Sequence, residues 1–500
     1  MAAHRLMGRA RHGRSGSIEA SGRSSASGAF AWSLTNTLVS RLGTLGIGIL
    51  LARVLGPEEF GTFAIALVAL MAVLSFNELG VSLAIVRWPG DPAAIAPTVN
   101  TLSLLGSALF CAASWLAAPA FTAAMGDPGA TDVVRILILS VLINGAVAGP
   151  AALLQRDFRE KTRMGIDQVN VWVGAIVSVI LALMGMGAMS LAVGRVLGSL
   201  LSAVLFVRAS PLPYRVGWHK EKARALLNFG LPLAGTSIIV FTIGYSDQLV
   251  AGSVAGTIAL GFYVLAFNLS SWPVSIVSQP LRRVAPAAFS AIQHDPARLR
   301  AVILGLFGVL GCATIPAFLA LAGAATPIVR FVYGDVWLPA AAILSWLVLS
   351  ALAKVFCELA YDYMVVIGRT SKVLMIQVVG LVVLIPALIF GAVWGGIVGI
   401  AAAQAIVSMI VLLPLYLWQL RGTGVRILDV LGKLWLPTLV GAAVACTAWW
   451  AASLFEQVIV ALLVGGLSAL LGIAGLLYLR RSDLRAIRGI VRAEKAGAIT

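Results

Sequence analysis

Apolar stretches long enough to cross a membrane recur along almost the whole chain. A helix needs about 20 mainly apolar residues to cross a hydrocarbon core of about 30 Å. The sequence holds fourteen such stretches, and its charged fraction is 11%, against about 25% in soluble proteins. We therefore predict an all-α polytopic membrane protein with about 14 transmembrane helices. The expected spans are 29–54, 62–86, 98–122, 133–155, 166–186, 188–208, 225–250, 256–281, 301–325, 337–367, 372–391, 394–419, 430–452 and 457–479.

The basic residues predict how these spans are oriented. Lys and Arg are enriched in cytoplasmic loops of membrane proteins. With the N-terminus inside, 30 of the 36 basic residues fall on the cytoplasmic side, and only Arg53, Arg135 and Arg330 fall outside. We therefore expect both termini to be cytoplasmic. The basic residues that orient the protein in the membrane then account for most of the net charge of +16, and no nucleic acid partner is expected.

Several kinds of chemistry lack their sequence signatures. The four cysteines are scattered through apolar stretches without a CxxC pair, and the four histidines lie outside those stretches. No GxxxxGK[ST] phosphate-binding loop is present. We therefore predict no catalytic residues, no metal site and no ATPase activity, and we expect a transporter rather than an enzyme.

Short matches at fixed offsets indicate an internal repeat. Matches at an offset of 200 are Val54/Val254, Gly56/Gly256, Gly61/Gly261 and Ala66/Ala266. Matches at an offset of 209 are Gln168/Gln377, Gly187/Gly396 and Ala192/Ala401. Gly, Ala and Val are abundant here, so chance is the alternative explanation. We favour two parallel six-helix lobes, related by an axis along the membrane normal, followed by two additional helices.

The expected organisation follows from the spans and the repeat. It comprises a disordered basic cytoplasmic tail (1–27), an N-terminal six-helix lobe (28–208), a cytoplasmic linker (209–224), a C-terminal six-helix lobe (225–420), two additional transmembrane helices (421–480) and a basic cytoplasmic tail (481–500).

Three motifs carry a family resemblance. The run Leu51–Gly61, LARVLGPEEFG, resembles a turn of bacterial polysaccharide exporters. The second half has similar counterparts at Ser246–Val250 with Ala259–Tyr263, and at Pro286–Ser290 with Asp295–Leu299. Over residues 28–420 the chain resembles the oligosaccharide flippase, or polysaccharide transporter, family. Its superfamily also holds multidrug exporters and the lipid II flippase.

The resemblance implies an architecture and an activity. It implies two six-helix lobes around a central cavity in the bacterial cytoplasmic membrane. The implied substrate is an undecaprenyl-diphosphate-linked oligosaccharide, moved from the inner to the outer leaflet by alternating access during cell-surface polysaccharide or lipopolysaccharide biosynthesis. Glycosyltransferases and a polysaccharide polymerase are the implied protein partners.

Ionisable residues inside spans are the candidate transport residues, because each costs roughly 2.5–3.5 kcal/mol on insertion scales. Arg41 lies near the middle of the first span, and its planar guanidinium suits a diphosphate. Alternatively, it pairs structurally with Glu78 of the second span. Arg195 faces either the cavity or a lobe interface.

Three charged residues share one face of span 337–367, because Lys354, Glu358 and Asp362 are spaced four apart. They could line the cavity, with the carboxylates as a proton or Na⁺ site. Alternatively, Lys354 and Glu358 neutralise each other while Asp362 lies at the membrane surface.

The remaining candidates lie near the ends of spans. Asp247 is either a coupling carboxylate or an interfacial cap. Arg53 at the outer mouth, and Arg282 with Arg283 at the inner mouth, could guide a diphosphate. The inner pair could equally be an ordinary cytoplasmic anchor.

Three functions remain open, and we favour the flippase. The alternatives are a cation-coupled small-molecule or multidrug exporter of the same superfamily and an integral-membrane polymerase or ligase. The sequence predicts no cofactor, and it leaves H⁺ or Na⁺ open as a coupling ion.

Overall fold

The structure of the chain, a computed structural model, describes residues 43, 46–75, 81–88, 90–291, 295–421 and 424–481. Within these ranges the chain is helical and contains no strand. A first helical segment spans Gly46–Ser75. The labelled α-helices are α2 (Val81–Arg87), α3 (Ala96–Ala124), α4 (Thr131–Arg156), α5 (Glu160–Leu183), α6 (Ala188–Ala209), α7 (Lys220–Val250), α8 (Thr257–Ala291), α9 (Pro296–Gly323), α10 (Ala325–Tyr333), α11 (Pro339–Val366), α12 (Thr370–Ile406), α13 (Leu413–Leu420), α14 (Ile427–Leu454) and α15 (Val458–Leu479). Short 3₁₀ or π segments are η1 (Pro92–Ala94), η2 (Pro128–Ala130), η3 (Ala251–Ala255), η4 (Asp335–Trp337) and η5 (Val407–Leu412).

Eleven helices in the described ranges are long and apolar enough to cross a membrane. The stretch Thr370–Leu420 is helical throughout and covers two of the fourteen predicted spans. The two spans meet at a sharp kink at Gly396. A Cβ built on Gly391 would overlap the carbonyl oxygen of Gly399, so the two halves pack closely beyond the kink. The helix α7 corresponds to the predicted span 225–250, and several side chains in its middle lie outside the description. Most of the first predicted span lies outside the described residues.

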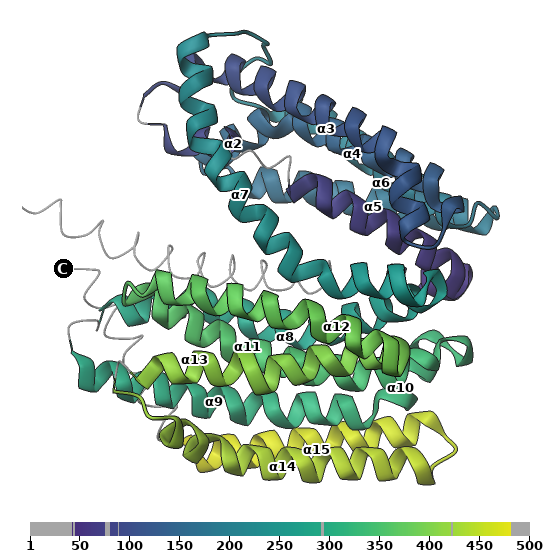
Figure 1. The fold of residues 1–500 in the computed structure, drawn as a ribbon, viewed down its shortest axis with the longest axis vertical. Helices are drawn as coiled ribbons and strands as arrows, with labels where there is room; N and C mark the ends of the chain where they lie inside the picture. The colour runs from purple at the N-terminus through teal and green to yellow at the C-terminus, as the bar shows by residue number, and fades with distance from the viewer. Residues whose placement is uncertain are drawn as a thin grey trace, which may run out of the picture.

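Two groups of helices form the body of the molecule (Figure 1). The segment Gly46–Ser75 and α2 to α6 form the first lobe, and α8 to α13 form the second. The long α7 runs diagonally between them, and its start packs on α2 and α3 while it also contacts α12. The helices α14 and α15 pack on the outside of the second lobe, mainly against α9.

The repeat pairs have matching backbone geometry. Gly187 and Gly396 have φ/ψ of 55°/−140° and 56°/−140°, a backbone conformation that residues with a Cβ atom rarely adopt. Gly56 and Gly256 likewise have φ of 75° and 86°. The same local turn therefore occurs at corresponding places in the two halves, which supports the repeat inferred from the sequence. The exact domain limits remain predictions.

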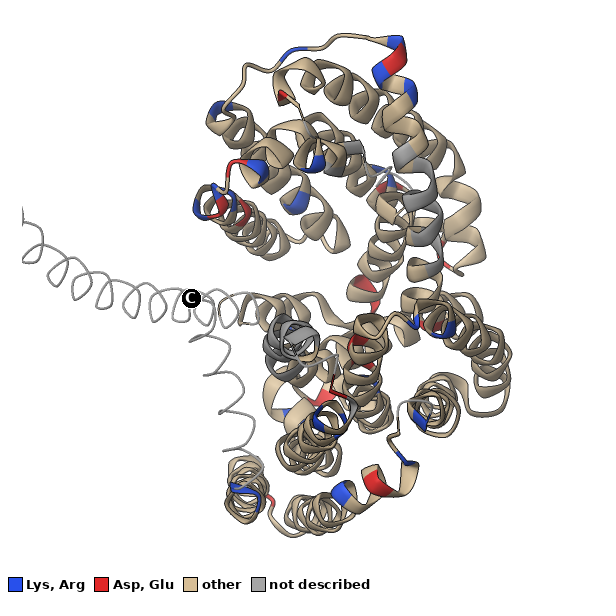
Figure 2. Ribbon diagram, turned by 90° about the vertical axis from the view of Figure 1, so that its left-hand side faces the viewer, with Lys and Arg blue, Asp and Glu red and all other residues tan. Residues whose placement is uncertain are grey.

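Charged residues are sparse in the helical body of the molecule (Figure 2). We call the end that carries the turns at Gly56, Gly256 and Gly334 the outer end, as the Lys and Arg distribution predicts. The largest apolar core runs from Ile65 and Leu137 of the first lobe to Leu260 and Phe318 of the second. The two lobes are therefore packed together through a continuous core.

Candidate functional site: a cavity between the lobes

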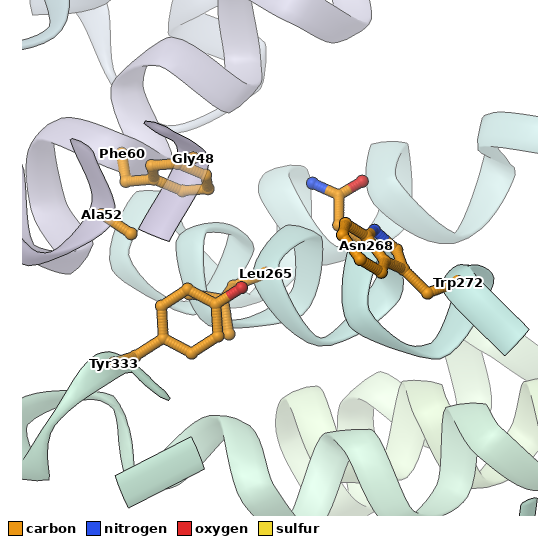
Figure 3. A pocket seen from close by; sticks show the side chains of 7 residues that line it. All are labelled: Gly48, Ala52, Phe60, Leu265, Asn268, Trp272 and Tyr333. Carbon is orange, nitrogen blue, oxygen red and sulfur yellow. The ribbon is translucent and has the colours of Figure 1, made fainter. Parts of the chain in front are cut away.

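A cavity of about 220 Å³ lies between the two lobes, close to the outer end. The segment Gly46–Ser75 forms one wall, and α8 with the end of α10 faces it (Figure 3). Its lining residues are Gly48, Ala52, Phe60, Leu265, Asn268, Trp272 and Tyr333. Three aromatic rings and one amide therefore surround a small space that both lobes complete.

A buried tryptophan holds two of these rings in place. Trp337 is only 1% exposed. Its ring centroid lies 5.6 Å from that of Phe60 in an edge-to-face contact, and 6.1 Å from that of Tyr333. Phe262 of α8 makes a second edge-to-face contact with Trp337 at 5.8 Å. Such contacts favour one ring geometry, so the aromatic wall is held by packing from both lobes.

Arg53 joins the lobes directly beside the cavity. Its Nε donates to the carbonyl oxygen of Val332 at 2.8 Å, and a terminal nitrogen donates to that of Phe331 at 2.6 Å. These carbonyls lie in the last turn of α10, where a helix has unsatisfied acceptors and negative partial charge. The guanidinium therefore caps α10 from the opposite lobe, a contact that the sequence did not predict.

Two glycines bring the lobes into backbone contact at the same end. A Cβ built on Gly61 would overlap the carbonyl oxygen of Thr257. One built on Gly261 would overlap the carbonyl oxygen of Pro57 and lie 3.1 Å from the amide nitrogen of Gly61. These glycines are a repeat pair, so the repeated turns pack on each other. We call this contact, together with the bonds of Arg53, the outer seal.

Asp247, on α7, is buried within the protein. It is 1% exposed, and its carboxylate accepts from the hydroxyl of Tyr263 at 2.9 Å and from the backbone N–H of Gln248 at 2.8 Å. Lys354 of α11 lies close enough to interact electrostatically with Asp247. The structure therefore brings together two candidates from different predicted spans.

The three charged residues on α11 differ in exposure along the helix. Lys354 is exposed, Glu358 is half-buried and Asp362 is 7% exposed. An exposed lysine in the middle of a membrane helix is best explained by a polar, water-accessible surface. Asp362 is packed within the protein and is not an exposed residue of the membrane surface.

Arg195 lies on α6 of the first lobe, and its side chain is accessible. It is close enough to Tyr245 of α7 for an electrostatic interaction. Tyr245 in turn interacts electrostatically with Asp247. Arg195, Tyr245 and Asp247 therefore lie near one another, although they come from two different helices.

Four candidates cannot be placed. Arg41 and Glu78 lie outside the described residues. Arg282 and Arg283 belong to α8, but their side chains are likewise outside the description. Their proposed roles stay predictions.

Charge inside the spans does not point to the residues that line the cavity. Phe60 lies within the Leu51–Gly61 motif, whereas Asn268, Trp272 and Tyr333 have no comparable signal. Uncharged aromatic and amide residues are common in membrane helices. Only their convergence on one cavity distinguishes these four.

Comparisons with known proteins agree with this architecture. The family model described as polysaccharide biosynthesis protein matches residues 50–342, more than half of the chain. The succinoglycan biosynthesis transport protein ExoT of Rhizobium meliloti is 24% identical over 388 residues, covering 76% of this chain and 78% of ExoT. The lipopolysaccharide biosynthesis protein WzxC of Escherichia coli is 24% identical over 416 residues, covering 81% and 83%.

Solved structures share the fold. The lipid II flippase MurJ, in an inward closed conformation, superposes with a TM-score of 0.75 at 15% identity, covering 90% of this chain and 98% of that one. An inward-facing multidrug transporter of the MATE family gives 0.61 at 16% identity, covering 77% and 95%. The family predicted from the Leu51–Gly61 motif is confirmed, and its relatives are transporters rather than enzymes. The chain therefore belongs to the polysaccharide biosynthesis protein family, as a multi-pass transporter of the bacterial cytoplasmic membrane.

Proposed function

We propose that the protein flips a lipid-diphosphate-linked oligosaccharide across the cytoplasmic membrane by alternating access. The observation that carries the proposal is a cavity between two lobes whose walls meet at an outer seal. A substrate with a large polar head group needs a path between the lobes that is shielded from hydrocarbon, because polar groups are costly there. The names of ExoT and WzxC place those relatives in polysaccharide biosynthesis, and MurJ is named as a lipid II flippase.

The accessible cations support an anionic substrate. Arg195 of the first lobe and Lys354 of the second are both accessible. Arginine and lysine both bind phosphate oxygens, through a planar fork and a point charge respectively. We propose that these two residues, with Arg41, attract the diphosphate, while the glycan occupies the space between the lobes.

Asp247 and the α11 carboxylates are our proposed link to an ion gradient. Asp247 is buried, and Lys354 lies near it. Binding or release of H⁺ or Na⁺ at a buried carboxylate would change its charge balance with Lys354. Such a change could favour one arrangement of the lobes over the other.

Transport can be tested in vesicles that contain the purified protein and a polyprenyl diphosphate with a fluorescently labelled saccharide. Flipping makes label from the inner leaflet accessible to an external quencher, so the quenched fraction should rise above that of protein-free vesicles. Arg195→Ala should slow this rise, and Arg135→Ala serves as a matched control, because Arg135 pairs with Asp132 within the first lobe.

A drug exporter would behave differently in the same vesicles. A cationic dye is the probe for that alternative, because the fold is also similar to that of a multidrug transporter of the MATE family. Dye transport without any movement of the labelled lipid would contradict the flippase proposal.

A further inference from the structure

The cavity has a chemistry of its own, separate from that of the charged residues. None of its seven lining residues is charged. Phe60, Trp272 and Tyr333 supply aromatic faces, while Asn268 and the Tyr333 hydroxyl supply hydrogen-bonding groups. A diphosphate would gain no cationic partner from these side chains. The cavity instead suits a ligand with both an apolar face and hydroxyl groups.

A sugar ring has this combination. The C–H groups on one face of a pyranose pack on aromatic rings, while its hydroxyls exchange hydrogen bonds with amides and phenols. Asn268 is exposed and projects from α8 toward the space between the walls (Figure 3). Its amide can donate to one hydroxyl and accept from another.

The size of the cavity limits how much it can hold. Pockets for drug-sized ligands are about 300–1,000 Å³, whereas this one is about 220 Å³. The space therefore suits one ring rather than a whole oligosaccharide. The contacts of Trp337 hold the Phe60 and Tyr333 rings before any ligand arrives, which reduces the entropy lost on binding.

We propose that this cavity is a subsite for a single sugar residue of the transported glycan, with Trp272 and Asn268 as specificity-determining residues. The proposal rests on the flippase function and deepens it. The cavity is lined by Ala52 and Tyr333. Ala52 precedes Arg53 in the chain, and Tyr333 follows Val332, whose carbonyl oxygen accepts from Arg53. A sugar bound there lies beside the outer seal, so its fit can influence whether the seal opens.

Binding of three synthetic probes to the protein in lipid nanodiscs tests the subsite. The probes are a short polyprenyl diphosphate without sugar and the same lipid carrying one hexose or a disaccharide, with glucosyl, galactosyl and mannosyl forms. At least one hexosyl probe should bind more tightly than the sugar-free lipid. Trp272→Ala and Asn268→Ala should each remove roughly three- to tenfold of that added affinity, while Trp272→Phe should retain most of it.

The control variant is Trp394→Ala, because Trp394 is 79% exposed and does not line the cavity. It should bind every probe as the unmodified protein does. Thermal stability of each variant in the nanodiscs separates loss of binding from loss of folding. If Trp272→Ala is unstable, Asn268→Ala and Trp272→Phe carry the test.

The possible failures are distinguishable. Equal binding of the sugar-free and all sugar-bearing probes would overturn the subsite and leave the flippase function standing. So would an equal loss of all probes in the stable variants. If no probe binds the unmodified protein, the flippase function itself fails, and the subsite fails with it.

Discussion

Arg53 makes a structural contact that its predicted role does not include. Its role as a guide for diphosphate at the outer mouth stays a prediction, and its guanidinium donates to the Phe331 and Val332 carbonyls of the other lobe. For the cavity to open outward, these bonds must break. We therefore interpret Arg53 as a residue that stabilises the outward-closed arrangement.

Replacing Arg53 with alanine should favour outward opening. The contact is exposed, so its loss should cost about 1 kcal/mol, enough to raise the open population several-fold. The measurement is the labelling rate of Gly48→Cys by a membrane-impermeant maleimide, in a variant whose four native cysteines are replaced. An unchanged rate, equal to that of the Arg135→Ala control, would contradict this role.

The neighbours of Asp247 explain how its carboxylate is accommodated inside the protein. A buried carboxylate is costly without partners. Here Tyr263 and the Gln248 N–H donate to it, and Lys354 supplies a nearby positive charge. These partners offset part of the cost of burying the carboxylate, and a change in its charge would alter the contacts between α7, α8 and α11.

Asp247→Asn should uncouple transport from the ion gradient. The amide is nearly isosteric, its oxygen can still accept from the Gln248 N–H, and its NH₂ can donate to the Tyr263 hydroxyl oxygen, so the fold should be retained. We expect transport in vesicles to lose most of its dependence on an imposed H⁺ or Na⁺ gradient. Tyr263→Phe is the comparison, because it removes the hydrogen bond but leaves the carboxylate. Full gradient dependence in Asp247→Asn would exclude Asp247 as the coupling group.

At the scale of helices, the repeated turns explain how the two lobes approach each other. Gly61 and Gly261 lie where each lobe begins the helix after its outer turn, and they pack backbone against backbone. Any side chain there would separate the lobes. The repeat therefore supplies both halves of the outer seal from corresponding positions.

Gly261→Ala should loosen the outer seal. The added Cβ would overlap the Pro57 carbonyl, and relieving such overlap typically costs about 1–3 kcal/mol. Spin labels at Val54 and Val336, which are both exposed at the outer end, should report a longer or broader distance distribution. Gly466→Ala on α15 is the control, since its Cβ would meet no atom within 4 Å. An unaltered distribution in Gly261→Ala would show that the seal tolerates the methyl group.

At the scale of the whole molecule, the proposed alternating access requires the two lobes to separate at one end during transport. At the outer seal, the first lobe contacts α8 through backbone packing and α10 through the hydrogen bonds of Arg53, close to the cavity. Fixing that seal covalently should therefore hold the molecule in the outward-closed arrangement.

A reducible bismaleimide between Val54→Cys and Phe331→Cys should stop transport, and reduction should restore it. Both positions are exposed, and Arg53, next to Val54, bonds to the carbonyl of Phe331. The same reagent between Asp132→Cys and Arg135→Cys, within α4, should leave transport intact. Undiminished transport in the cross-linked protein would contradict lobe separation at this end.

Much of the architecture could be predicted from local sequence patterns. Apolar length predicted the helices, and the glycine matches predicted equivalent turns such as those at Gly187 and Gly396. Both properties depend on residues close together in the chain. The helix limits were less predictable, because the chain stays helical on both sides of a single kink at Gly396.

The cavity could not be predicted in the same way. Phe60, Asn268 and Tyr333 come from three separate helical elements and carry no charge that makes them unusual in a membrane helix. Asp247 and Lys354 stand out in the sequence as charges within predicted spans, but the sequence does not indicate that they lie near each other. Proximity between distant residues depends on how helices pack, which the pattern within each helix does not specify.

The sequence by itself determined that this chain is a polytopic helical membrane protein with an internal repeat and a polysaccharide-family motif, because apolar length, periodic glycines and short motifs are local properties. Only the tertiary structure decided that Arg53 caps α10, that Gly61 meets Gly261, and that an uncharged aromatic cavity lies beside them. The physical reason is that each of these features is made by two lobes together, through contacts between residues separated by about 200 or more positions in the chain.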